Sequence, residues 1–251
     1  MNKQVNKFLQ IAYAEIGYVE KASNKNLDSK TGNPGKGNYT KYGRDLKAWT
    51  GSKAYGIDYQ WCDQFYDWVM VKAFGLDEAK RLLGGWSAYT PTSAQYYKDK
   101  NRWHTGKDCL PGDQIFFKNS VRICHTGAVY RTDDTYIYTV EGNTNPGRTV
   151  ESDGGEVALK KYVWGHPSIA GYGRPAWNED VSDTTEPGWY TDETGTWYRH
   201  TKGTGPNTYY HSIIKEVDGK VFCFNENGYV IKKTPVLVNM NKETGELTFK
   251  R

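Results

Sequence analysis

Long apolar runs and closely paired cysteines are both missing from this chain. No stretch of about 18 apolar residues occurs, so no membrane span is expected. The cysteines contain no Cys-x-x-Cys pair, and their scatter is unlike a disulfide framework, so neither a zinc site nor a disulfide scaffold is predicted. The four cysteines are Cys62, Cys109, Cys124 and Cys223. We therefore expect free thiols, and a single thiol can serve as a nucleophile.

Signal-peptide features and dense basic runs are also missing. Residues 1–17 lack the apolar run of a signal peptide, so we expect synthesis and initial retention in a reducing cytoplasm. The formal net charge is only +4 and charged residues make up 25%, without Lys/Arg clusters, so nucleic acid is not an expected partner. A mild basic excess is compatible with an anionic polymer such as a cell wall, and equally with simple solubility.

Aromatic residues and glycine, by contrast, are plentiful. The chain has 20 Tyr, 9 Trp and 27 Gly among 251 residues. Tyrosine and tryptophan combine a flat apolar face with a polar edge, which suits sugars and wet grooves. Packing in β-rich structure explains the same composition, so composition alone leaves both explanations open.

Hydrophobic periodicity changes along the chain from helical to alternating. Helices are expected over residues 6–16, 39–46, 61–75, 77–83 and 92–100, with a long polar loop at 22–38. Strands are expected over residues 113–118, 124–131, 135–141, 156–163 and 169–173. Helices followed by a run of strands indicate an α+β domain with an antiparallel sheet.

The last quarter of the chain differs in amino-acid composition. Residues 177–187 are polar and acidic and end in proline, which is typical of a linker. Residues 188–251 contain aromatic strands around Asp-Gly and Asn-Gly turns, which predict a small all-β module of hairpins built from two imperfect repeats. The predicted organisation is a catalytic domain at 1–176, a linker at 177–187 and the β module at 188–251.

The candidate catalytic residues are a cysteine, a histidine and a glutamate. Cys62 is expected at the N-terminal end of a helix, where a thiolate is favoured. The segment 132–134 is predicted to be a hairpin loop, which places His125 directly opposite Glu141, with Asn143 one step further on the same face. This arrangement predicts Cys62 as nucleophile, His125 as base and Glu141 as the group that orients the imidazole, with Asn143 assisting.

Other residues near Cys62 have weaker assignments. The Cys62 backbone N–H is expected to hold the oxyanion, helped by the side chain of Gln60 or Tyr59. Asp58 and Asp63 are too few for a recognised calcium loop, so a solvated or capping role is expected for them. Taken singly, a helix-borne cysteine is more often a buried small hydrophobe than a nucleophile, and a strand histidine opposite glutamate is about as often structural as catalytic.

Four segments in this order resemble the CHAP family, the cysteine, histidine-dependent amidohydrolases/peptidases. They are QWCDQF at 60–65, PGDQIFF at 111–117, HTGAVY at 125–130 and VEGN at 140–143. AEIGY at 14–18 and NYTKY at 38–42 also resemble lysins of this family. The resemblance covers roughly residues 1–176 and implies a papain-like fold that cleaves amide bonds in bacterial peptidoglycan. It assigns the same roles to Cys62, His125, Glu141 and Asn143.

The resemblance bears on metals and on the C-terminal module as well. Some CHAP proteins bind calcium through an acidic loop before the cysteine. No clear loop of that kind occurs here, so no metal or cofactor is predicted, and calcium dependence is left open. The tail resembles short aromatic wall-binding repeats of the choline-binding type. An SH3-like barrel, assembly with another protomer, or a purely structural aromatic core are the alternatives. The candidate wall-binding residues are Trp189, Trp197, Tyr198, Phe222, Phe224 and Tyr229.

The predicted function is therefore that of a phage-type peptidoglycan hydrolase, either an N-acetylmuramoyl-L-alanine amidase or a peptidoglycan endopeptidase. It would be made in the host cytoplasm and act on the wall after release. Its expected partners are peptidoglycan and, as a further candidate, wall-associated glycan, without nucleic acid or membrane; oligomerisation through the C-terminal module is left open. The alternatives are a papain-like peptidase acting on proteins and an inactive wall-binding protein.

Overall fold

The computed structural model describes residues 2–145, 155–177, 186–191, 195–201, 209–211, 213–225, 227–232, 238–240 and 247–249. The chain divides into two units, Met1–Val181 and Ser182–Arg251. Most of the expected linker, residues 178–185, lies outside the described residues.

The helices of the first unit come before most of its strands, as expected. They are α1 (Lys3–Ala14), α2 (Lys41–Thr50), α3 (Cys62–Phe74), α4 (Leu76–Leu83) and α5 (Thr90–Asp99). Each matches a predicted helix to within a few residues. α1 begins after Asn2, whose side chain accepts a hydrogen bond from the Gln4 amide at 2.8 Å and so caps the helix. Among the described residues, no helix is both long enough and apolar enough to cross a bilayer.

The strands of the first unit form one antiparallel sheet in the order β1-β6-β2-β3-β4-β5. Their bounds are β1 (Trp103–His104), β2 (Gln114–Lys118), β3 (Ile123–Thr132), β4 (Tyr136–Thr144), β5 (Glu156–Val163) and β6 (Ile169–Gly173). Strand β1 is not predicted from the sequence, because two residues carry no readable alternation. The α+β class is confirmed, with helices α1, α3 and α5 contacting the sheet.

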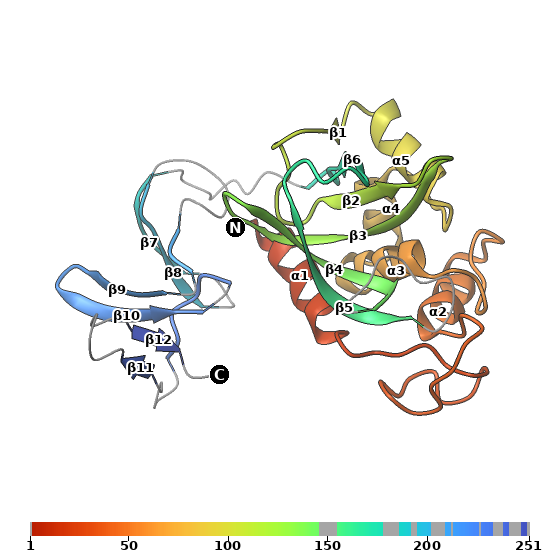
Figure 1. Ribbon diagram of the computed structural model, residues 1–251, viewed down its shortest axis with the longest axis horizontal. Coiled ribbons are helices and arrows are strands. Elements are labelled where there is room, and N and C mark those ends of the chain that lie inside the picture. Colours follow the sequence, from red (N-terminus) through yellow and green to blue (C-terminus); the bar gives the residue numbers. More distant parts are fainter. Residues whose placement is uncertain are drawn as a thin grey trace. The chain divides into compact units, whose positions relative to one another are not determined.

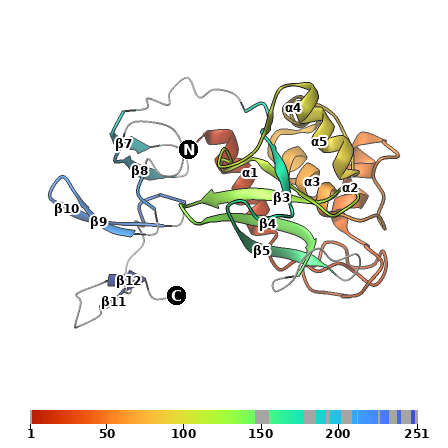
Figure 2. The same cartoon turned by 45° about the horizontal axis from the view of Figure 1, so that its top comes forward.

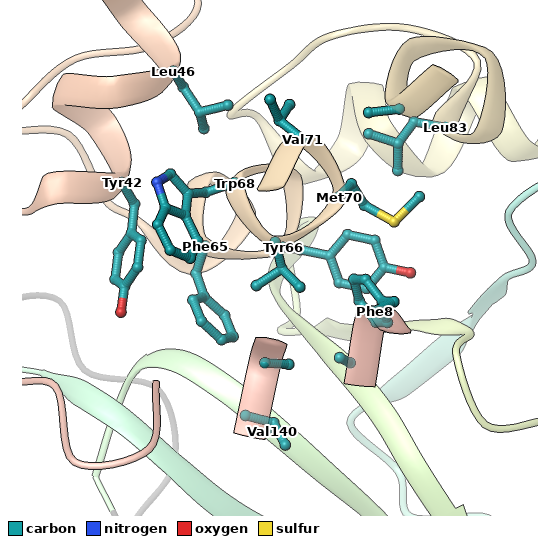
Figure 3. Packing of buried hydrophobic residues seen from close by; sticks show 14 of the residues in the cluster. Phe8, Tyr42, Leu46, Phe65, Tyr66, Trp68, Met70, Val71, Leu83 and Val140 are labelled. Atoms are coloured by element: carbon teal, nitrogen blue, oxygen red, sulfur yellow. The ribbon is translucent and has the colours of Figure 1, made fainter. Parts of the chain in front are cut away.

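Helix α3 is the centre of the main hydrophobic core, and it is buried on all sides. It lies against β3 and β4, and α1, α2 and α4 contact it as well (Figures 1 and 2). Its polar residues Asp63, Gln64 and Asp67 are buried together with the apolar ones, so they need hydrogen-bond partners within the protein. Figure 3 shows its side chains meeting those of the surrounding elements: Phe65, Tyr66, Trp68, Met70 and Val71 of α3 with Phe8, Tyr42, Leu46, Leu83 and Val140.

Alternate residues of the central strands face opposite sides of the sheet. Phe116 belongs to the main core with the helices, whereas its neighbours Ile115 and Phe117 belong to a second, smaller cluster. In the same way Ala128 belongs to the main core and Val129 to the smaller one. Both faces of the sheet are therefore apolar, and polar side chains between these strands need hydrogen-bond partners within the protein.

Strand β4 approaches the first turn of α3 closely at Gly142. A methyl group added there would lie 2.7 Å from Cβ of Phe65 and 2.8 Å from Cζ3 of Trp61. We expect Gly142→Ala to lower the free energy of unfolding of the first unit by about 1–3 kcal/mol, because the overpacked strand must shift away from the helix. Urea unfolding of the full chain, followed by tryptophan fluorescence, would measure this; an unchanged midpoint would contradict the close packing.

The second unit consists of short antiparallel hairpins in the residues that the structure describes. β7 (Gly188–Thr191) pairs with β8 (Thr196–Arg199), β9 (Ile213–Val217) with β10 (Lys220–Phe224), and β11 (Val238–Met240) with β12 (Leu247–Phe249). Asp218 and Gly219 connect β9 to β10 with φ of 52° and 74°. Positive φ at both positions is typical of a tight hairpin turn, so the Asp-Gly prediction is confirmed.

Candidate active site

The thiol of Cys62 lies at the start of the central helix. Cys62 is the first residue of α3 and is 6% exposed, and all four cysteines of the chain are free. The N-cap residue, Trp61, offers no side-chain hydrogen bond to the amide N–H groups of the first turn of α3. The N-terminus of a 13-residue helix carries a partial positive charge, which favours an anion at this position.

His125 and Glu141 form a buried hydrogen-bonded pair. His125 Nε2 lies 2.9 Å from Glu141 Oε2, and both side chains are almost completely buried. Glu141 also accepts hydrogen bonds from the Thr139 hydroxyl to Oε1 at 2.5 Å and from the Tyr162 hydroxyl to Oε2 at 3.2 Å. The His125 ring packs beside Phe117, with ring centroids 5.7 Å apart. These contacts fix the carboxylate and, through it, the orientation of the imidazole.

The predicted strand register that brought this pair together is wrong in detail. Ala128 pairs with Val140, and an irregularity follows Val129, so the strands are offset by two residues from the predicted pairing. The difference arises at the turn, where Asp133 N donates to the Tyr136 carbonyl and Thr132 pairs with Ile137, three residues beyond the predicted partner. The bulge in β3 then reduces the offset to two. A shift by two residues keeps every side chain on its face, so the contact survives as a diagonal one.

Gly127 is the residue that leaves room for the carboxylate in this register. A methyl group at Gly127 would lie 2.4 Å from Glu141 Cγ. We expect Gly127→Ala to displace Glu141 and lower kcat/KM on the order of tenfold, since misplacing a catalytic group by a fraction of an ångström is costly. Turnover and thermal unfolding measured on the same variant separate the two effects. A variant with lowered stability but unchanged kcat/KM would show that the carboxylate tolerates displacement.

The charges of the pair reinforce each other. Burial lowers the pKa of His125, but the neighbouring Cys62 side chain and Glu141 raise it more, so that the pKa reaches about 9. Burial raises the pKa of Glu141, but the hydrogen bonds from His125 and Thr139 and the charges of His125 and Lys160 together outweigh it, and the pKa of Glu141 falls below its usual value. An imidazolium beside a carboxylate is therefore the favoured state at neutral pH.

The second ring nitrogen of His125 points away from Glu141 and has no fixed partner. Nδ1 is buried and makes no hydrogen bond of ordinary geometry with the residues that the structure describes. The Cys62 side chain nevertheless lies close enough to raise the pKa of the ring. Catalytic hydrogen bonds are often long before substrate binds and tighten afterwards. His125 can thus serve Cys62 through one nitrogen while Glu141 holds the other.

The structure does not show all of the remaining predicted site residues in contact with the His125–Glu141 pair. Asn143 is buried in an irregular part of β4 with φ of 54°, and its Oδ1 finds no partner among the described residues. Gln60 and Tyr59 precede Cys62 and are exposed, Tyr59 by 49%. Their carbonyl oxygens accept hydrogen bonds from Gln64 Nε2. The assisting role of Asn143 and the oxyanion role of the two others stay predictions.

Asp63 is placed differently from the expectation. It is fully buried, and its carboxylate accepts hydrogen bonds from Ser93 and Gln114 instead of facing solvent or capping α3. Asp58, in contrast, is exposed. Across the described part of the chain, no group of three or more His, Cys, Asp or Glu side chains is arranged to hold a metal ion.

The aromatic residues of the second unit fall into two groups. Phe224 is fully buried and Tyr229 is 7% exposed, so their rings serve packing and the wall-binding assignment is withdrawn for these two. Trp189 contacts Phe222 and Tyr198 at ring-centroid distances of 4.6 and 5.0 Å. The half-buried members of the predicted set keep the wall-binding prediction: Trp189, Trp197, Tyr198 and Phe222.

Two residues of the site are missed by sequence reasoning. Thr139 lies two positions before Glu141 on the same strand face, so strand alternation could have identified it. Tyr162 comes from β5, opposite Ile137, and reaches Glu141 diagonally. Strands β4 and β5 pair Thr144 with Glu156, 12 positions further along the chain, and no signal in the sequence fixes this register. Tyr162 could therefore be found only from the folded chain.

Comparison with known proteins gives little further information. No protein-family model and no curated protein matches the chain. Among solved structures, the wild-type endolysin LysIME-EF1 is similar over 79% of this chain and 79% of its own, with 13% sequence identity and a TM-score of 0.39. The functional proposal for this chain therefore rests on the geometry around Cys62 and His125 and on the sequence motifs.

Proposed function

We propose that this protein hydrolyses an amide bond with Cys62 as the nucleophile and His125 as the general acid and base. The observation that supports this most strongly is the buried His125–Glu141 hydrogen bond of 2.9 Å, with the Cys62 side chain acting on the same imidazole from the start of α3. A thiol at a helix N-terminus, a histidine and an orienting carboxylate are the three parts that cysteine nucleophile catalysis needs.

The chemistry follows from these positions. The Cys62 sulfur attacks the amide carbonyl carbon, and the uncapped N–H groups at the start of α3 stabilise the negative charge that develops on the oxygen. His125 gives its proton to the leaving amine, and the C–N bond breaks to leave a thioester on Cys62. A water molecule, deprotonated by His125, then attacks the thioester and the C–S bond breaks. This releases a carboxylic acid and restores the Cys62 thiolate beside protonated His125, the state from which the reaction began.

The proposed substrate class is bacterial peptidoglycan. The support is the ordered set of motifs that resemble the CHAP family, all of which lie on elements of the first unit: α3, β2, β3 and β4. The resemblance to this family implies hydrolysis of an amide bond. The enzyme would be either an N-acetylmuramoyl-L-alanine amidase or an endopeptidase that cleaves the stem or bridge peptides. The papain-like arrangement of α3 and the sheet belongs to the same proposal.

The second unit is proposed to bind the cell wall. Trp189, Trp197, Tyr198 and Phe222 keep part of their surface exposed, and partly exposed indole and phenol rings suit sugar faces. Trp189 Nε1 donates to Asp218 Oδ2 at 2.8 Å, which holds the indole in place. With this targeting unit, the protein would act on the wall from outside or after release from a host cell, with wall-associated glycan as its further ligand.

One comparison of substrates tests this proposal. The full chain is incubated with purified Gram-positive walls and with casein, and binding to walls is measured by co-sedimentation. We expect soluble fragments from walls and none from casein. Hydrolysis of casein alone would favour a protein peptidase, and wall binding without hydrolysis would favour an inactive wall-binding protein; either result would overturn the proposal.

A further inference from the structure

Asp63 is a fully buried carboxyl group directly after Cys62 in α3. Its oxygens accept hydrogen bonds from two other elements: Oδ2 from Ser93 Oγ of α5 at 2.7 Å and Oδ1 from Gln114 Nε2 of β2 at 2.9 Å. Gln114 Oε1 accepts in turn from the Tyr97 hydroxyl of α5 at 2.9 Å. A buried carboxyl whose oxygens are both bound in this way ties the first turn of the helix to its neighbours.

Asp63 also interacts with His125 through charge. Burial raises the pKa of Asp63 to about 7, while its hydrogen bonds and the charge of His125 oppose that rise. Electrostatic interaction is mutual, so an ionised Asp63 stabilises the protonated form of His125 by the same free energy. Apart from burial, the largest influences on the pKa of His125 are those of Cys62 and Glu141. His125 is thus influenced by two carboxyl groups, one bonded and one acting through space.

Another buried carboxyl group lies one helical turn further along α3. Asp67 accepts a hydrogen bond from the Tyr55 hydroxyl at 2.5 Å, and burial, followed by the charge of Asp63, raises its pKa. Tyr97 is the remaining titratable group near Asp63, and burial raises its pKa well above the usual value. Asp67 therefore shares the helix and the burial of Asp63, but the groups that shift its pKa are Asp63 and Tyr55, and His125 is not among them.

We propose that Asp63 is a positioning residue of the catalytic pair, which fixes the start of α3 against β2 and α5 and supports the protonated form of His125 together with Glu141. The inference rests on the proposed function, because it assigns Asp63 a part in the Cys62–His125 chemistry. Asp63 acts through the helix start and through the imidazole, not by contact with substrate.

The pH dependence separates this role from a merely structural one. Above about pH 7 Asp63 is ionised and supports the imidazolium. Below that pH Asp63 carries a proton and contributes little charge. Removing the charge should therefore leave activity nearly unchanged in mild acid and reduce it in mild alkali, where His125 loses its proton earlier. A substitution that only loosens the helix would lower activity at every pH.

The experiment measures kcat/KM of the full chain on purified walls across pH for wild type and Asp63→Asn, which is close to isosteric. We expect the alkaline limb of the profile to move down by about half to one pH unit, with about a twofold to fivefold loss near pH 9 and little loss near pH 6. Asp67→Asn is the matched control, and its alkaline limb should not move down. A uniform loss at all pH values for Asp63→Asn, or no loss, would overturn the inference.

Two further measurements keep the inference testable if that variant folds poorly or if no activity is found. Gln114→Leu keeps Asp63 but removes one donor to it, which should raise the pKa of Asp63 and reduce activity just above pH 7, where Asp63 is then ionised only in wild type. NMR titration of the His125 ring in the full chain reads the interaction without substrate, and its pKa should be lower in Asp63→Asn. If wild type is inactive but the pKa of His125 is lower in Asp63→Asn, only the proposed function is refuted. If wild type is active but the pKa of His125 is the same in Asp63→Asn, only this inference is refuted.

Discussion

Replacing Cys62 with alanine should reduce the rate of wall clearing by roughly a thousandfold or more. The variant removes the atom that forms the covalent bond. Cys124 lies near Cys62, but it belongs to strand β3 instead of a helix N-terminus, and burial raises the pKa of its thiol. The measurement is the initial loss of turbidity of a wall suspension, which follows hydrolysis directly.

The control for this prediction is the fold of the variant. Cys62 is 6% exposed at the start of α3, and alanine is the best helix former, so the helix should be retained. Cys124→Ala, a change of the same size next to His125 in sequence, should keep most of the activity. Wall clearing by Cys62→Ala at the wild-type rate would show that another group is the nucleophile.

Removing the carboxylate of Glu141 should have the second largest effect. We expect Glu141→Ala to lower kcat/KM by roughly a hundredfold to a thousandfold, because the buried imidazole loses both its orientation and its counter-charge. The hydroxyl groups of Thr139 and Tyr162, which donate to this carboxylate, would also lose their acceptor. Steady-state rates on walls at several substrate concentrations would measure the loss.

The conservative variant Glu141→Gln isolates the charge from the geometry. The carboxylate raises the pKa of His125, so a neutral amide should lower that pKa from about 9. The alkaline limb of the pH–rate profile should therefore move to lower pH, and by more than for Asp63→Asn, since Glu141 is hydrogen-bonded to the ring. If the alkaline limb of the pH–rate profile is unchanged in Glu141→Gln, deprotonation of His125 is not the cause of the loss of activity at alkaline pH.

Much of the first unit can be predicted because its signals are local. The stripe of apolar residues in α3 and the alternation in β2 to β6 depend on neighbours along the chain, and these elements form where the pattern predicts them. His125 and Glu141 are also found from the sequence, although the register was two residues off. The error is harmless because an even shift preserves the faces of a strand.

The parts that sequence reasoning misses depend on contacts between distant segments. Asp63 reads as a solvated or capping residue next to Cys62, and only the packing of α5 and β2 onto α3 buries it beside Ser93 and Gln114. Tyr162 reaches Glu141 through the β4–β5 register, which no local pattern determines. Phe224 reads as a ligand-binding ring because aromatic composition does not distinguish a core from a binding surface.

The most direct test of the central claim is a measurement of the groups released from purified walls by wild type and by Cys62→Ala under identical conditions. The account predicts that wild type liberates new amino groups without new reducing sugar ends, and that Cys62→Ala liberates neither. Reducing ends without amino groups from wild type, or amino groups from Cys62→Ala at the wild-type rate, would contradict cysteine-dependent cleavage of an amide bond.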